Sequence, residues 1–338
     1  MTSQGQIPRI GVIGTGHLGS LHAKMLAQIP SAVFVGVHDT DPARAEQVAS
    51  MHGVRSFERR EDLLAAVDAV TVATVTSTHH NVVLAALQAG KHVLVEKPIT
   101  STTEEAQQLV DLAASRGLTL QVGHIERFNP AILALEPLKV RPLFIESHRL
   151  AQFNPRGADV AVVLDLMIHD IDLILSLVGS PVDRIDANGV AVVSDTPDIA
   201  NARIQFRNGC VANVTASRIS QNKMRKMRLF QHDAYISIDF AQPVAEVFRI
   251  VDEGDAQVQP TMLLGKIDQG SRKRLIVYER LEIPPLNALL EEMRSFVNCV
   301  ATGATPVVSG RDGLQALDVA AEILRSIESH TVRSSDRG

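Results

Sequence analysis

The chain of 338 residues is long enough for two domains, and its 45% hydrophobic and 21% charged residues are ordinary values for a globular protein. A formal net charge of −5 argues against nucleic acid as a main partner. The two cysteines suit a reducing compartment and exclude a disulfide framework. No apolar run is long enough for a membrane span, and residues 1–10 lack the apolar core of a signal peptide, so we expect a cytoplasmic protein with no membrane partner.

The first motif with a chemical meaning follows Arg9–Ile13, an apolar segment that predicts a short buried strand. A G-x-G-x-x-G pattern comes directly after it, and apolar residues at helical spacing continue to Ile29. Glycines in this pattern permit a tight turn and the close approach of a pyrophosphate, which the N–H groups at the start of the helix attract. The context predicts a dinucleotide-binding turn that consists of Gly14, Gly16, His17, Leu18 and Gly19.

An acidic residue follows the second predicted strand, residues 32–37. Asp39 lies twenty positions after the last glycine of the motif. A carboxylate there suits the two ribose hydroxyls of NAD and repels the additional phosphate of NADP. Arg44 can in principle hold that phosphate, so NADP remains the alternative. We therefore predict NAD as the cofactor.

Strand and helix patterns alternate at short intervals from residue 7 to about residue 122, which predicts a parallel, doubly wound sheet. Helix signals include Asp41-Pro42, an N-cap followed by proline, and Gly90 and Gly117 after the last helical residues. Ligands of such sheets bind at the carboxyl ends of the strands. We expect one cleft to gather the residues at these ends, which are Gly14, Thr74, Lys97 and Gly123.

The pattern changes after residue 123. We predict helices at 130–138, 160–178, 286–300 and 313–327, and a strand at 144–150. A hairpin is predicted around Asn208-Gly209, because Asn-Gly readily adopts the primed turns. Further strands are predicted at 226–231, 235–240, 245–251 and 275–282. The predicted architecture is an α/β Rossmann domain, residues 1–123, followed by an α+β domain, residues 124–338, with an open-faced and mostly antiparallel sheet.

The strand that begins at Val93 ends in an acid, a lysine and a proline. Because burying an unpartnered ammonium group is costly, a lysine at the end of a strand usually lies at the edge of a cleft. Pro98 restricts the backbone of Lys97 to an extended conformation and so favours a set direction for its side chain. Lys97 is therefore a candidate functional residue.

The predicted long helix is apolar nearly all round but carries Asp165, His169 and Asp172 at positions i, i+4 and i+7. The simpler interpretation is that these residues form the solvated side of the helix. The functional interpretation is that a carboxylate and an imidazole, one turn apart, face the cofactor cleft, where histidine suits proton transfer near neutral pH. Neither an H-E-x-x-H motif nor a Cys/His cluster accompanies them, so no metal site is predicted.

The motifs as a set resemble the Gfo/Idh/MocA oxidoreductase family over roughly residues 7 to 328. They are the glycine turn, residues 74–79, Glu96-Lys97-Pro98, Asp165 with His169, and residues 306–313. One departure is Val75, where the family usually carries proline, and it concerns the nicotinamide loop rather than the fold. The resemblance implies hydride transfer between a sugar or polyol carbinol and NAD(P), in a homodimer or homotetramer. It adds Thr74, Thr76, His79, Glu96 and Lys97 as cofactor-binding residues.

By the same resemblance Lys97 binds the reacting hydroxyl and takes part in proton transfer. His169 serves as acid and base, and Asp165 orients it. The chemistry agrees with this division, because hydride departure from a C–H bond requires removal of the proton from the hydroxyl group. These three residues are the predicted catalytic set, and they also contact the substrate.

Residues 123–130 and 164–172 look most like a branch of the family that oxidises the 3-hydroxyl of UDP-N-acetylglucosamine in lipid A biosynthesis. In that branch an aminotransferase consumes the ketone. Arg127 and Asn129 are the further substrate residues that the resemblance implies, and both suit polar recognition of a sugar. The alternative for Arg127 is an ion pair with Glu126 or another neighbour.

A dense basic run, from Arg218 to Arg228, stands out on an otherwise acidic chain. Arg218 and its neighbours can cradle a diphosphate, because guanidinium groups pair bidentately with phosphate oxygens. The alternative is a solvated sheet face or a subunit interface.

Two other functions remain open from the sequence. The first is an inositol or simple aldose dehydrogenase, which has the same lysine, aspartate and histidine. The second is a non-catalytic NAD-binding regulator, which has no need of all three.

Overall fold

The computed structural model describes residues 7–154, 160–253, 262–269 and 272–335. They form two compact units, one from residues 1–128 and 286–318 and the other from residues 129–285 and 319–338. A single boundary after residue 123 does not describe this division, because the chain returns to the first unit near its end.

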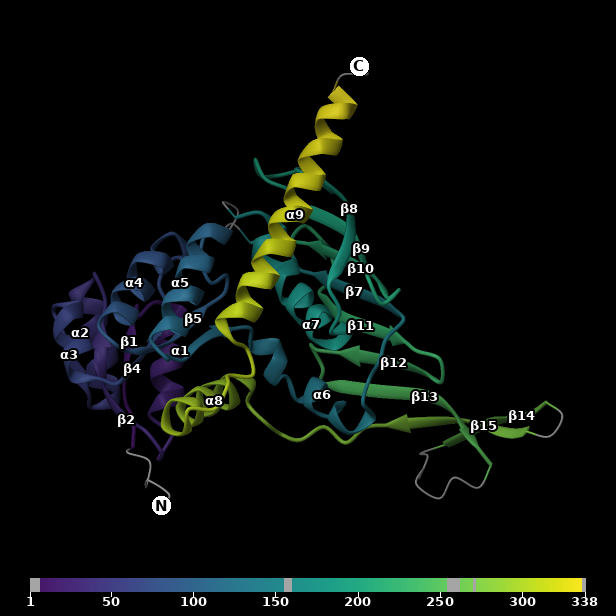
Figure 1. Ribbon diagram of the computed structural model, residues 1–338, viewed down its shortest axis with the longest axis horizontal. Helices are drawn as coiled ribbons and strands as arrows, with labels where there is room; N and C mark the ends of the chain where they lie inside the picture. Colours follow the sequence, from purple (N-terminus) through teal and green to yellow (C-terminus); the bar gives the residue numbers. More distant parts are fainter. Residues whose placement is uncertain (1–6, 155–159, 254–261, 270–271, 336–338) are drawn as a thin grey trace. The chain divides into compact units, whose positions relative to one another are not determined.

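The first unit is built on a parallel sheet with the strand order β3-β2-β1-β4-β5-β6 (Figure 1). The order reverses between β1 and β4, as in dinucleotide-binding folds, which confirms the predicted Rossmann architecture. The strands are β1 (Arg9–Ile13), β2 (Val33–His38), β3 (Arg55–Ser56), β4 (Ala69–Val72), β5 (His92–Glu96) and β6 (Leu120–Gly123).

Helices connect these strands, and one of them begins at the predicted Asp41-Pro42 signal. Asp41 caps the second helix by accepting hydrogen bonds from the N–H groups of Ala43 and Arg44. Thr102 and Glu105 form a capping box at the start of the fifth. The helices of this unit are α1 (His17–Leu26), α2 (Pro42–His52), α3 (Arg60–Ala66), α4 (Thr76–Gln88), α5 (Thr103–Ser115), α8 (Ala288–Thr302) and the beginning of α9 (Gly310–Ser335).

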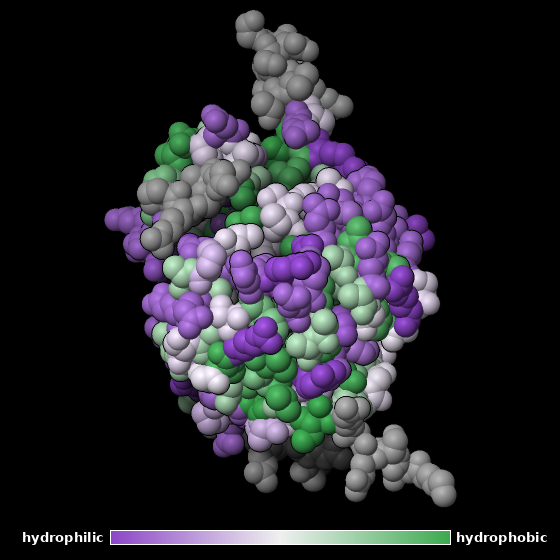
Figure 2. All heavy atoms as spheres, turned by 90° about the vertical axis from the view of Figure 1, so that its left-hand side faces the viewer, coloured by the Kyte–Doolittle hydropathy of each residue, from purple (hydrophilic) through white to green (hydrophobic). Residues whose placement is uncertain are grey.

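Helix α8 belongs to the first unit because its apolar side completes the core of that unit. Met293 and Phe296 are fully buried in one cluster with Ile10 and Leu26. The beginning of α9 also packs closely on this unit. A Cβ atom on Gly313 would come within 2.5 Å of a methyl group of Val122. Figure 2 shows that purple hydrophilic and green hydrophobic residues are intermixed on the outer surface of this unit.

The second unit contains a sheet with the order β14-β15-β13-β12-β11-β7-β10-β9-β8. Among the described strands of this second sheet, β7 and β10 form the one parallel pair, so the predicted, mostly antiparallel sheet is confirmed. Strands β8 and β14 were not predicted, because neither alternates cleanly between apolar and polar residues. The strands are β7 (Phe144–Leu150), β8 (Val182–Val190), β9 (Ile199–Phe206), β10 (Val211–Ser217), β11 (Met224–Phe230), β12 (Ala234–Asp239), β13 (Val244–Asp252), β14 (Met262–Gln269) and β15 (Arg272–Arg280).

The predicted hairpin connects β9 and β10, but its turn differs from the expected one. Gly209 has a φ of +87° and donates its N–H to the carbonyl of Phe206, whereas Asn208 has no positive φ. A primed two-residue turn requires a positive φ at both central residues. The observed loop is therefore three residues long, with glycine supplying the left-handed position.

The predicted single helix at 160–178 is two elements. A π-helical turn, Val163–Met167, precedes helix α7 (Ile168–Val178), which ends at Gly179 in the left-handed conformation. Figure 1 shows α7 lying against the middle of the second sheet. Asp165 and His169 are half-buried but Asp172 is buried, so the three do not form one solvated stripe. The predicted i, i+4, i+7 spacing assumes 3.6 residues per turn, and Asp165 lies in a π-helical turn, which contains more residues per turn.

The predicted helix at 130–138 is shorter, consisting of α6 (Pro130–Leu133) and a 3₁₀ turn at Glu136–Leu138. Among the described helices, none combines the length and the apolarity needed to cross a lipid bilayer.

Candidate active site

A cavity of about 600 Å³ opens in the first unit where β1, β2 and β4 end. The glycine turn forms one wall, and the start of α4 forms another. Several predicted cofactor residues meet here, as the topology of a doubly wound sheet requires. The lining residues are Ile13, Gly14, Gly16, His17, Leu18, His38, Asp39, Thr40, Arg44, Arg60, Ala73, Thr74, Val75, Thr78, Asn81 and Val82.

The three glycines of the turn serve different purposes. Gly14 has a φ of +89°, which side chains rarely tolerate. Gly19 packs so tightly that a Cβ atom would come within 1.8 Å of the Gly14 carbonyl oxygen. At Gly16, by contrast, a Cβ atom would meet nothing within 4 Å, and this residue caps α1 without a side-chain hydrogen bond. The start of α1 therefore presents N–H groups beside open space, which fits a pyrophosphate.

Asp39 is held at the end of β2 by a defined set of donors. One carboxylate oxygen accepts hydrogen bonds from the N–H and hydroxyl of Thr15, at 2.6 and 3.0 Å, and the other from the N–H of Asp41 at 2.9 Å. Burial raises the pKa of Asp39, but these hydrogen bonds and the charge of Arg44 outweigh it and lower the pKa below its usual value. The side chain is thus an oriented carboxylate, as recognition of ribose hydroxyls requires.

Two arginines share this cavity with Asp39. Arg44 is half-exposed and lies 3.4 Å from Asp41, which partly neutralises it. Arg60, which the sequence analysis did not select, stands at the start of α3 and lies 3.4 Å from Glu61. Arg60 could have been selected from its position shortly after the third predicted strand, because ligands of doubly wound sheets bind where the strands end.

The loop after β4 carries the predicted nicotinamide residues. Val75 precedes α4 with a φ of −72°, the value that proline would impose, so its difference from the family pattern leaves the backbone compatible with that pattern. His79 is buried and its two ring nitrogens lie 2.9 Å from the Pro98 carbonyl and 3.1 Å from the Thr74 carbonyl. His79 therefore connects two loops, and neither it nor Thr76 lines the cavity.

Glu96 and Lys97 lie at the carboxyl end of β5. Glu96 is buried and accepts hydrogen bonds from His22 at 2.9 Å and from the N–H of Lys97 at 3.2 Å. Lys97 is half-buried, and its peptide bond to Pro98 is cis. Glu96 thus holds the end of β5 in place through His22 and the backbone of Lys97. Neither Glu96 nor Lys97 lines the 600 Å³ cavity.

The second unit has a cavity of about 280 Å³ beside the π-helical turn. Asp165 reaches it together with three basic side chains and two amides. His169 follows one turn later on α7 and is half-buried. The lining residues are Leu150, Ala151, Gln152, Asn154, Asp165, Leu166, Arg218, Lys223 and Arg225.

A buried ion pair fixes α7 to the sheet behind this cavity. The guanidinium group of Arg149, on β7, donates to both carboxylate oxygens of Asp170 at 2.8 and 3.1 Å. Both side chains are almost fully buried, and a bidentate pair of this kind sets the orientation of the helix. No local pattern predicts this pair, because its residues lie on separate elements, β7 and α7.

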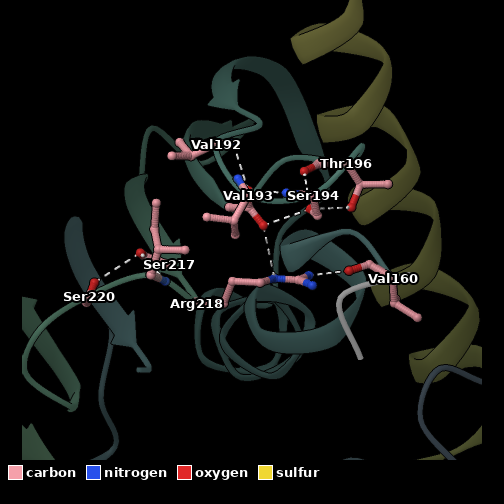
Figure 3. A network of polar contacts seen from close by, with 10 residues as sticks. Val160, Val192, Val193, Ser194, Thr196, Ser217, Arg218 and Ser220 are labelled. Atoms are coloured by element: carbon pink, nitrogen blue, oxygen red, sulfur yellow. Dashed lines mark hydrogen bonds and ion pairs between the residues drawn. The ribbon is translucent and has the colours of Figure 1, made fainter. Parts of the chain in front are cut away.

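Arg218 is more enclosed than the sequence analysis expected. Figure 3 shows its guanidinium group directed at the carbonyl of Val160, to which it donates a hydrogen bond, and it lies 3.9 Å from Asp198. Asp198 in turn accepts hydrogen bonds from the N–H groups of Val192, Val193 and Ser194. Arg218 therefore holds the chain just before the π turn, although it still borders the cavity.

The remaining predicted substrate residues have structural partners. Arg127 lies 3.8 Å from Asp312 within the first unit, so it forms the ion pair that was its alternative, with a different partner. Asn129 caps α6 by accepting a hydrogen bond from the N–H of Ala131 at 3.0 Å. Neither residue lines the two cavities described above. Across the described side chains, His, Cys, Asp and Glu form no group of three or more that could hold a metal ion.

Comparisons with known proteins define the class. Residues 8–124 match a family model described as "Oxidoreductase family, NAD-binding Rossmann fold", and residues 145–237 match the model "GFO/IDH/MocA C-terminal domain". The fold and the glycine-lined cavity are those of a nicotinamide-dependent dehydrogenase that acts on CH–OH groups. The chain belongs to the Gfo/Idh/MocA family of oxidoreductases.

Individual relatives span almost the whole chain. UDP-N-acetylglucosamine 3-dehydrogenase of Acidithiobacillus ferrooxidans is 39% identical over 327 residues, which cover 96% of this chain and 99% of the relative. A solved structure of the enzyme of that name from the same organism has a TM-score of 0.85 at 38% identity and covers 95% of this chain and 98% of its own. Myo-inositol 2-dehydrogenase of Thermotoga maritima is 26% identical over 95% of this chain and 96% of the relative.

Proposed function

We propose that this protein is an NAD-dependent dehydrogenase that oxidises the 3-hydroxyl of UDP-N-acetylglucosamine or a related nucleotide sugar. The observation that carries the proposal is the cavity of the second unit, where Asp165 shares one wall with basic side chains. A nucleotide sugar needs cations for its diphosphate and, close to them, the carboxylate that orients the proposed acid–base residue His169. The relative that is 39% identical over almost its full length bears the name of that activity.

The choice of NAD rests on Asp39. Its carboxylate lines the 600 Å³ cavity, is ionised and is held in place by Thr15 and Asp41. A fixed negative charge favours ribose hydroxyls and disfavours a 2′-phosphate. The opposing positive charge of Arg44 is reduced by its own neighbour, Asp41.

Three residues carry the proposed chemistry. Lys97 binds the reacting hydroxyl and shares in the transfer of its proton, and His169 acts as acid and base while Asp165 orients it. The nicotinamide ring, when bound, accepts the hydride. The local settings support these roles, because the backbone of Lys97 is anchored by Glu96 and the half-buried His169 lies on a helix fixed by a bidentate ion pair.

A fluorescence assay tests the proposal. The purified protein is mixed with NAD and, in parallel, with UDP-N-acetylglucosamine, free N-acetylglucosamine or myo-inositol, and a trapping reagent removes the ketone. We expect NADH emission only with the nucleotide sugar, and mass spectrometry then locates the ketone. Emission with myo-inositol instead would favour the alternative function, to which the inositol dehydrogenase relatives correspond. Silence with every substrate despite NAD binding would favour the regulator.

We also propose a homodimer or homotetramer, and an aminotransferase that consumes the product. Half-buried aromatic rings cross five strands on the face of the sheet opposite α7, with centroid separations of 5.0 to 5.7 Å. An apolar face of this kind suits contact with a second copy in a homodimer or homotetramer, which light scattering can measure. The rings are Phe144, Phe230, Tyr235, Phe248 and Tyr278. The keto product is a substrate for an aminotransferase, which a coupled assay with an amino donor tests.

A further inference from the structure

Strand β11 and the turn before it carry four basic residues in two different settings. Lys226 lies 3.4 Å from Asp239, and Arg228 lies 3.3 Å from Glu146, so each of these two cations has a carboxylate partner. Lys223 and Arg225 line the 280 Å³ cavity instead. Within the described part of the chain, neither of their side chains forms a hydrogen bond or an ion pair.

The alternation of side chains along β11 explains this difference. Arg225 has the same parity as Met227 and Leu229, which are buried, so it points to the side of the sheet that α7 covers. Lys226 and Arg228 point to the opposite face, where their carboxylate partners stand. The two pairs of cations are therefore separated by the sheet.

The neighbour of Arg225 increases the local positive charge. Arg225 lies opposite Arg149 of β7 in the sheet. The carboxylate of Asp170 forms its ion pair with Arg149 and leaves the charge of Arg225 uncompensated. Like charges opposite each other on a sheet are unfavourable unless something compensates them. Arg218, the third cation of the cavity, already holds Val160 and Asp198. Lys223 and Arg225 are thus the two side chains of this cavity that an anion can compensate.

We propose that Lys223 and Arg225 bind the diphosphate of the nucleotide sugar, and this inference rests on the proposed function. A diphosphate diester carries one negative charge on each phosphate, and the planar guanidinium of Arg225 can pair with two phosphate oxygens while Lys223 supplies a point charge. Asp165 lines the same cavity, so the anion and the sugar it is attached to lie beside a proposed catalytic residue. The site would thereby select nucleotide sugars over free sugars and inositols, which offer no diphosphate.

A charge-removal experiment with a matched control tests the site. The double variant K223A/R225A is compared with K226A/R228A, which removes two cations of the same segment from the other face. Calorimetry measures the Kd of UDP, and initial rates give KM for UDP-N-acetylglucosamine and for NAD. We expect K223A/R225A to weaken UDP and to raise the KM of the nucleotide sugar by about 10- to 100-fold, with the KM of NAD within about twofold of wild type.

The control and the salt dependence give independent readouts. K226A/R228A should change UDP binding by less than about threefold, and added salt should weaken UDP binding to wild type more than to K223A/R225A. Because both target residues are exposed, thermal melting should show that the variant folds normally.

An unchanged Kd for UDP in K223A/R225A, or an equal loss in K226A/R228A, would overturn the site. If wild type still oxidises the nucleotide sugar in that case, the proposed function stands without the site. If wild type neither binds UDP nor oxidises the nucleotide sugar, both fail together.

Discussion

The imidazole of His22 and the carboxylate of Glu96 meet at 2.9 Å in the interior of the Rossmann unit. His22 stands on α1, the helix that follows the glycine turn, and Glu96 ends β5 one residue before Lys97. Burial raises the pKa of Glu96, but the hydrogen bond and charge of His22 and the charge of Lys97 outweigh it and lower the pKa. This pair therefore connects the helix after the glycine turn to the strand that ends just before Lys97, and we propose that His22 positions this lysine.

Replacing His22 should impair turnover more than cofactor binding. His22→Ala leaves a buried carboxylate without its partner, which costs about 1–3 kcal/mol of stability. We expect kcat to fall about 10- to 100-fold because Lys97 is displaced. His22→Gln, which can donate a hydrogen bond from its amide, should recover much of kcat. The measurement is steady-state kinetics with thermal melting, and a normal kcat in His22→Ala would contradict the role.

Removing the amine of Lys97 should separate binding from chemistry. Lys97→Ala is expected to bind NAD with a Kd near that of wild type, because Lys97 does not line the 600 Å³ cavity. Turnover should fall by about 10²- to 10⁴-fold, the usual contribution of a positioned acid–base group. Isothermal calorimetry with NAD and a rate assay decide the point together. Full activity in this variant would exclude the proposed mechanism.

Asp39 should control the choice between NAD and NADP. Asp39→Asn removes the negative charge and one of the two accepting oxygens, so KM for NAD should rise about 10- to 100-fold. The preference for NAD over NADP should shrink, because the repulsion of the 2′-phosphate is lost. The double variant Asp39→Asn/Arg44→Ala should lose any gain in NADP use seen in Asp39→Asn, because Arg44 is the residue that can hold the 2′-phosphate. The ratio of kcat/KM for the two cofactors measures this, and an unchanged ratio would count against Asp39.

Asp198 should make stability depend on acid pH. Burial raises the pKa of Asp198, but hydrogen bonds from the N–H groups of Val193 and Val192 and from Ser194 outweigh it and lower the pKa to about 2. The pKa of Asp198 is lower in the folded protein than in the unfolded chain, where it is about 3.9. Its ionised carboxylate therefore stabilises the folded protein above about pH 3.9, and this stabilisation is lost as the pH falls toward about 2.

The variant that tests this is Asp198→Asn. It should unfold at lower temperature than wild type at pH 7, because N–H groups lose a charged acceptor, at a cost of about 2–3 kcal/mol. Thermal melts from pH 7 to pH 3 should show the difference narrowing below about pH 4. A difference that does not change with pH would assign the effect to packing alone.

Features that depend on neighbours along the chain could be predicted from the amino-acid sequence. The glycine turn, the Asp41-Pro42 helix start and the buried strand that leads to Lys97 were all predicted correctly, because turn geometry, capping and apolar runs act over a few residues. The order of these elements was also sufficient for the parallel sheet and for the family, which the comparisons confirm. Local rules reach this far because the start, the end and the buried side of an element depend on residues close together in the chain.

Contacts between residues that are distant in the chain became visible only in the folded protein. The basic run reads as one feature in the sequence, yet the sheet places Lys226 and Arg228 beside carboxylates and turns Arg225 toward the cavity. Likewise, the return of α8 to the first core and the pairing of His22 with Glu96 join segments far apart in the chain. Burial and ion pairing depend on the distances between side chains in the folded protein, and packing between elements sets those distances.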